Sequence, residues 1–188
     1  MSGMKSAGVV PGGEGQLSVS QHPSTKAIES LLRECQQRQV RRGGPGGQRR
    51  NKVETGVVIT HQPSGITAEA SERRHLKDNL PLAIRRLRLA LAVSVRGRRG
   101  AGAVAGPSSL WCSRCRGGRL VVSESHWDFP ALVAEALDVL DGLDWSVMAA
   151  AESLGCSSSQ LVRLLRRWRP ALELLNGHRE QLGERRLR

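Results

Sequence analysis

Residues 43–48 read Gly-Gly-Pro-Gly-Gly-Gln and are flanked by arginine pairs at 41–42 and 49–50. Such a glycine-rich stretch cannot lie inside a helix or a strand, because glycine loses more backbone entropy on ordering than any other residue. The hexapeptide is therefore predicted to be a loop. The arginines on both sides favour contact with phosphate groups, and the Gln48 amide adds a donor and an acceptor that do not ionise.

The same loop continues into a longer motif. Residues 42–55 read RGGPGGQRRNKVET, and residues 59–66 read ITHQPSGI. Together these motifs resemble the catalytic domain of class I peptide chain release factors and their small ribosome-rescue relatives, over about residues 24–92. The resemblance implies that Gly46, Gly47 and Gln48 enter the peptidyl transferase centre of the ribosome and catalyse hydrolysis of peptidyl-tRNA.

The resemblance also implies how such a loop works. Glycines let the backbone approach the ester closely, and the Gln48 backbone N–H would donate to the oxygen that gains charge during hydrolysis. The Gln48 side chain would admit water and exclude bulkier nucleophiles. No cofactor and no protein general base are expected, because in the family the terminal ribose of the tRNA and the ribosomal RNA contribute instead.

The net charge of +12 is concentrated in the middle of the chain. Residues 31–120 carry 19 basic and 5 acidic side chains, whereas residues 121–188 carry 8 and 10. This pattern predicts a polyanionic partner, because cationic side chains displace the counterions condensed on nucleic acid. A solvated charged surface is the alternative for each cation. The predicted RNA contacts are Arg41, Arg42, Arg49, Arg50, Lys52, Arg73, Arg74, Arg96, Arg98 and Arg99.

The apolar pattern predicts an α+β fold for residues 24–92, after a disordered segment at 1–23. A helix capped by Ser24 or Thr25 leads into a strand over 37–42, and strands at 56–61 and 66–70 form a hairpin. A basic amphipathic helix follows, with Ser71 as its candidate N-cap; Pro81 is expected to kink this helix or to mark its start near Asn79. Asn51 is expected to fix the exit of the loop, and His61 to be structural.

The remainder of the chain is predicted to be a linker and a helical domain. Residues 93–120 contain no acidic residue and are expected to be a flexible cationic linker. Residues 121–188 are expected to form a helical bundle in which helices at 147–154 and from an N-cap at Ser157 or Ser158 make a helix-turn-helix, with Trp111 and Trp127 packed in this domain. A plain three-helix bundle with a charged exterior is the alternative. Cys112 and Cys115 have zinc-knuckle spacing, but two of the four ligands of a structural zinc are missing, so no metal is predicted.

The function predicted from these features is codon-independent hydrolysis of peptidyl-tRNA on stalled ribosomes. A stop-codon-reading domain is not expected, because only 23 residues precede the first predicted helix. The expected partners are large-subunit ribosomal RNA and P-site peptidyl-tRNA, with the basic segment 96–119 in the mRNA channel. Without a secretory signal or a long apolar stretch, a cytoplasmic monomer is expected. The alternative is a non-catalytic RNA- or ribosome-binding regulatory protein that uses the basic region and the helix-turn-helix.

Overall fold

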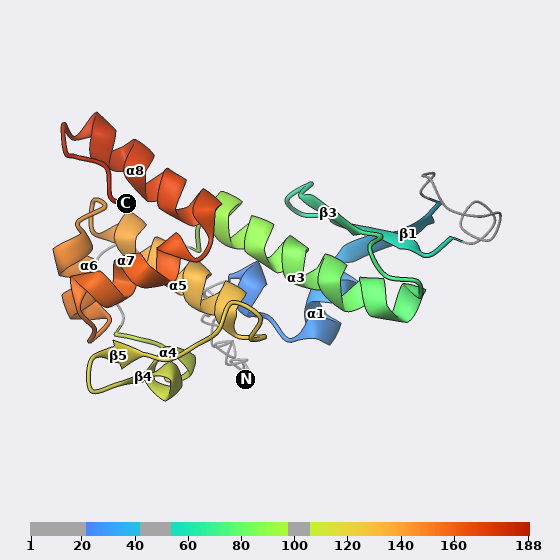
Figure 1. Cartoon of the computed structure of the whole chain (residues 1–188), viewed down its shortest axis with the longest axis horizontal. Coiled ribbons are helices and arrows are strands. Elements are labelled where there is room, and N and C mark those ends of the chain that lie inside the picture. Colours follow the sequence, from blue (N-terminus) through green and yellow to red (C-terminus); the bar gives the residue numbers. More distant parts are fainter. Residues whose placement is uncertain (1–21, 42–53, 98–105) are drawn as a thin grey trace, which may run out of the picture.

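The computed structural model describes residues 22–41, 54–97 and 106–188. These residues form an α+β structure, as predicted, in which a small antiparallel sheet is joined to a group of helices by the long helix α3 (Figure 1). In chain order the elements are η1 Pro23–Thr25, α1 Ile28–Arg33, β1 Cys35–Val40, β2 Gly56–His61, β3 Thr67–Ala70, α3 Leu76–Ser94, α4 Ser109–Arg114, β4 Cys115–Arg116, β5 Arg119–Leu120, α5 Phe129–Gly142, α6 Val147–Ser153, α7 Ser158–Arg166 and α8 Arg169–Gln181.

The three-stranded sheet has the order β1-β2-β3, and both neighbouring pairs are antiparallel. Val57 and Ile59 of β2 are buried on the face that packs against α3, as the alternation of β-branched residues leads one to expect. The β2–β3 turn is closed by hydrogen bonds from the His61 N–H to the Ile66 carbonyl and from the Gly65 N–H to the His61 carbonyl, and Gly65 adopts a φ of +69° that favours glycine. The predicted hairpin is confirmed.

The N-terminal helix differs in its start from the prediction. Helix α1 follows Ala27, which gives no side-chain cap, whereas Ser24 and Thr25 belong to the preceding 3₁₀ turn. The Ser24 hydroxyl instead donates to the Arg88 carbonyl at 2.8 Å. The Ser24 side chain, which the local sequence pattern predicted to cap a helix, therefore makes a tertiary hydrogen bond instead.

Helix α3 also starts differently. Its N-cap is His75 and not Ser71, and Pro81 lies inside the helix. Proline at the sixth helical position removes one hydrogen bond, but the buried residues Ala83, Ile84 and Leu87 pack on the sheet just beyond it. Burial of this apolar face explains why the helix extends through the proline.

The helical part is built around α5, whose residues from Phe129 to Leu140 are all buried. Helices α6 and α7 confirm the predicted helix-turn-helix order: Gly155 has a φ of +64°, and the Ser157 hydroxyl accepts from the Gln160 N–H. Helix α8 was not predicted. The expectation of a flexible linker is wrong for residues 109–120, because these form α4 and the β4–β5 hairpin and bury Trp111 completely.

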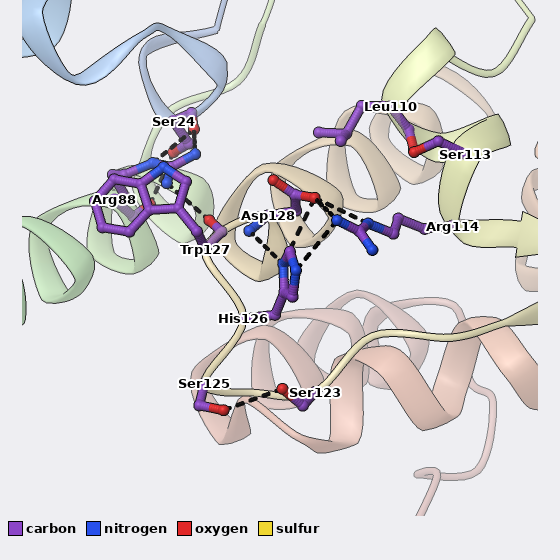
Figure 2. Close-up of polar contacts among 10 residues, drawn as sticks. All are labelled: Ser24, Arg88, Leu110, Ser113, Arg114, Ser123, Ser125, His126, Trp127 and Asp128. Atoms are coloured by element: carbon purple, nitrogen blue, oxygen red, sulfur yellow. Dashed lines mark hydrogen bonds and ion pairs between the residues drawn. The ribbon is translucent and has the colours of Figure 1, made fainter.

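The two parts meet along α3 and α5, and Arg88 of α3 lies buried between them. Its guanidinium donates to the Ser24 carbonyl at 2.7 and 3.0 Å and to the Trp127 carbonyl at 2.8 Å, and it stacks over the Trp127 ring at 4.7 Å (Figure 2). Burial lowers the pKa of Arg88 to about 10. Trp127 therefore packs with the cluster beneath the sheet and not, as predicted, in the helical domain.

Among residues 22–41, 54–97 and 106–188, no helix is both long enough and apolar enough to span a membrane.

Candidate functional site at the base of the glycine loop

The glycine loop connects neighbouring strands β1 and β2, which places both of its ends at the same end of the sheet. Val40 pairs with Gly56 in the last rung of the ladder. The predicted catalytic residues Gly46, Gly47 and Gln48 lie outside the described residues, as do Arg42, Arg49, Arg50, Asn51 and Lys52. The structure describes the base of the loop, by which we mean residues 40–41 and 54–56 at the ends of β1 and β2.

An ion pair joins the two ends of the loop. Arg41 Nε lies 3.0 Å from Glu54 Oε1, across the gap between the strands. Both side chains are largely exposed, at 62% and 41%, so the pair contributes little to stability. The pair joins the last described residue before the loop to the first described residue after it.

Asn79 fixes the exit of the loop. Its side chain is fully buried, and its Nδ2 donates to the Thr55 carbonyl at 2.7 Å and to the Arg73 carbonyl at 3.0 Å. The Arg73 N–H in turn donates to Asn79 Oδ1 at 2.9 Å. One amide on α3 thus holds the strand that leaves the loop and the β3–α3 connection together. For this role the sequence indicated Asn51, which lies outside the described residues, and Asn79 was not singled out.

Gly56 allows the close approach at this point. A Cβ at Gly56 would lie 2.8 Å from Val40 Cγ2 and 3.0 Å from the Val40 carbonyl oxygen. Contacts this short are not tolerated between real atoms, so the strand pair below the loop depends on glycine here.

Exposed cations gather around the base. The β3–α3 connection that Asn79 ties to Thr55 carries Arg73 and Arg74, both exposed as predicted. Within the described part of the chain, neither of these two side chains makes a hydrogen bond or an ion pair. We call Arg73, Arg74 and Arg41 the cationic rim: Arg73 is tied to Thr55 through Asn79, and Arg41, paired with Glu54, follows β1 directly. Exposed cations of this kind suit contact with phosphate groups.

His61 supports the hairpin and does not face solvent. The imidazole is 2% exposed, with Nδ1 2.7 Å from Ser64 Oγ and Nε2 3.1 Å from Glu34 Oε2. Lys26 donates to the other oxygen of Glu34, and this bond is the main reason that the pKa of Glu34 is lowered. The arrangement ties the β2–β3 turn to the end of α1 and agrees with the structural role predicted for His61.

Arg96, one of the predicted RNA contacts, has partners within the fold. Its guanidinium donates to the Ala92 carbonyl at 2.7 Å and to the Val93 carbonyl at 2.5 Å, and it lies 3.4 Å from the buried Asp138 carboxylate. The guanidinium therefore caps the end of α3, and its contact with RNA stays a prediction. Arg98 and Arg99 lie outside the described residues.

The cysteine pair shows no metal-binding arrangement. Cys112 is exposed, and the Cys115 thiol lies 3.6 Å from the Gly155 carbonyl. In the ranges that the structure describes, no group of three or more His, Cys, Asp and Glu side chains is placed to hold a metal ion.

Comparison with known proteins places the resemblance on this same region. Residues 26–101 match the family model of the RF-1 domain. Peptide chain release factor 1 of Chloroherpeton thalassium is 46% identical over 61 residues, which is 32% of this chain and 17% of the relative. Peptide chain release factor 1 of Chlorobaculum tepidum is 52% identical over 48 residues, 26% of this chain and 13% of the relative.

For another relative, the match covers a larger share of the relative's own length. An uncharacterised mitochondrial peptide chain release factor-like protein of Saccharomyces cerevisiae is 36% identical over 73 residues, 38% of this chain and 47% of the relative. The chain therefore spans less than a fifth of the two bacterial relatives and about half of the yeast protein. No solved structure matches the chain at a significant level.

Proposed function

We propose that this protein hydrolyses the ester that joins a nascent peptide to tRNA on the ribosome, and the match of residues 26–101 to the RF-1 domain model supports this proposal. The observation that carries the proposal is the coincidence of the family match with a loop held at both ends. The β1–β2 ladder, the Arg41–Glu54 pair and the buried Asn79 amide fix the ends of the segment that carries the glycine motif.

This chemistry requires that the two ends of the loop are held in place. A catalytic loop without its own acid or base acts by placing backbone groups, and a misplacement of about 1 Å can cost about 100-fold in rate. In this proposal Gly46 and Gly47 allow close approach to the ester, and the Gln48 N–H donates to the developing oxyanion. The cationic rim of Arg41, Arg73 and Arg74 would contact ribosomal or tRNA phosphates.

We further propose that hydrolysis does not depend on a stop codon and takes place on stalled ribosomes. The test compares ribosome complexes that carry labelled peptidyl-tRNA and either a stop codon, a sense codon or no codon in the A site. Release from the complex without a codon supports the proposal, whereas release confined to stop codons contradicts it. The cytoplasmic location and the monomeric state stay predictions from the sequence.

The catalytic role is tested by replacing Gln48 with alanine. Peptide release should fall by about 100-fold or more, the usual effect of losing a transition-state contact, while co-sedimentation with ribosomes persists. Gln37→Ala is the matched control, because Gln37 is an exposed glutamine on β1 that leads toward the same loop. If the unmodified protein binds ribosomes but releases no peptide, the protein is a non-catalytic binding protein instead.

A further inference from the structure

A second concentration of positive charge lies far from the glycine loop. The β4–β5 hairpin carries Arg116 and Arg119, and both side chains are exposed. Neither of these two side chains makes a hydrogen bond or an ion pair within residues 22–41, 54–97 and 106–188. We call these residues the arginine hairpin patch. In Figure 1 it lies at the end of the molecule opposite to the strand ends that carry the loop.

The hairpin places two like charges directly opposite each other. Arg116 and Arg119 are cross-strand partners, and the turn between them consists of Gly117 and Gly118 with φ angles of +55° and +74°. Two positive φ angles in succession define the tight turn preferred by two-residue hairpins. Side chains directly opposite each other lie about 5 Å apart, and like charges there destabilise the hairpin.

The chain segments that build the hairpin and pack against it contain no acidic residue. Strand β5 packs against α7, and Arg167 of α7 donates to the Val122 carbonyl just after β5. The sequence contains no acidic residue from Val93 to Ser123 or from Ser153 to Leu172. Arg116 and Arg119 therefore have no acidic partner within β4, β5 or α7.

We propose that the arginine hairpin patch binds the phosphodiester backbone of RNA. The Cβ atoms of directly opposed residues lie about 5 Å apart, so the two guanidinium groups of this short, glycine-closed hairpin can each bind an oxygen of the same phosphodiester backbone. The proposal rests on the proposed function, because it gives the ribosome-bound protein a second RNA contact remote from the loop. It assigns to the helical part a role in affinity that is separate from hydrolysis.

The test replaces both hairpin arginines with glutamine in the full chain, as Arg116→Gln/Arg119→Gln. The control is Arg33→Gln/Arg185→Gln, which removes the same net charge from exposed arginines elsewhere. Binding of a labelled oligouridylate is followed by fluorescence anisotropy over a range of salt concentrations. Loss of two phosphate contacts should reduce the salt slope by about 1.4 and weaken binding by about 25-fold at 0.1 M salt, with a much smaller effect in the control.

Thermal melting distinguishes RNA binding by the two arginines from a role in stabilising the fold. If the arginines served the fold, the hairpin variant would melt at a lower temperature than the control; relief of like-charge repulsion should instead leave its melting temperature unchanged or higher. If the two variants bound RNA with equal affinity and equal salt slope, the proposal would be overturned, and the patch would be a candidate surface for a protein partner.

Peptide release at saturating protein distinguishes the two proposals. The hairpin variant should then hydrolyse at the normal rate, and Gln48→Ala should bind RNA with the normal affinity. If the hairpin variant loses RNA affinity but the unmodified protein never releases peptide, the hydrolase proposal is wrong and the proposal for the patch is supported.

Discussion

Replacing Asn79 with alanine tests whether the hydrogen bonds at the base of the loop control the rate of peptide release. The substitution removes three hydrogen bonds, two to the Thr55 and Arg73 carbonyls and one from the Arg73 N–H. At about 1 kcal/mol each, the free energy of unfolding should fall by about 3 kcal/mol. For a protein of this size that corresponds to a decrease of about 6–12 °C in the melting temperature.

The decisive readout is peptide release measured well below the melting temperature. A loop exit that is no longer tied to α3 should lower the single-turnover release rate by roughly 10- to 100-fold, because a catalytic backbone group must be held within about 1 Å.

Asn176→Ala supplies the matched control for this experiment. Asn176 is equally buried, it lies in α8, and it makes two hydrogen bonds with the backbone of Leu187. This variant should lose about 2 kcal/mol of stability and keep its release rate. If the two variants release peptide equally fast at equal folded fraction, the reasoning about the loop base is refuted.

Two further predictions concern stability. Gly56→Ala should cost about 1–3 kcal/mol, because its Cβ would press on Val40, whereas Gly142→Ala, where a Cβ meets nothing within 4 Å, should be neutral or slightly stabilising; equal urea midpoints would contradict this. Burial lowers the pKa of His22 from 6.5 to about 4. Since the unfolded chain takes up this proton at a higher pH than the folded one, the free energy of unfolding should fall by about 3 kcal/mol as the pH drops from about 6.5 to 4. His22→Gln should remove that part of the pH dependence in urea titrations, and identical curves for the two proteins would refute the assignment.

Elements defined by local pattern could be predicted from the sequence. Strand β2 was predicted at its observed bounds, and the turn after it and the Ser157 cap were also correct, because β-branched alternation, a positive-φ glycine and a capping hydroxyl act within a few residues. The motif that suggests hydrolysis was equally local, since its residues are consecutive in the chain.

Features that depend on tertiary contacts were missed. Asn79 and Arg88 were not singled out, because a polar residue on an amphipathic helix is ordinarily assigned to the solvent face. Both nevertheless lie at helical spacing from buried apolar residues: Asn79 is four residues before Ala83, and Arg88 is four residues after Ile84. A buried Asn or Arg in the apolar stripe of a helix is the signal that could have marked both as points where separate segments are joined.

The junction at Arg88 determines how the two RNA contacts are related. An apolar interface between α3 and α5 would tolerate some sliding, since the hydrophobic effect has no direction. Arg88 instead binds carbonyls of two separate segments, at Ser24 and Trp127, and a buried guanidinium that lost either partner would pay a large desolvation cost. These bonds therefore fix the orientation of the helical part relative to the sheet. The 19 residues of α3 span about 28 Å, so the loop base and the arginine hairpin patch are held at a constant separation. Contact of the patch with RNA would consequently position the loop as well as add affinity, which a flexibly tethered domain could not do.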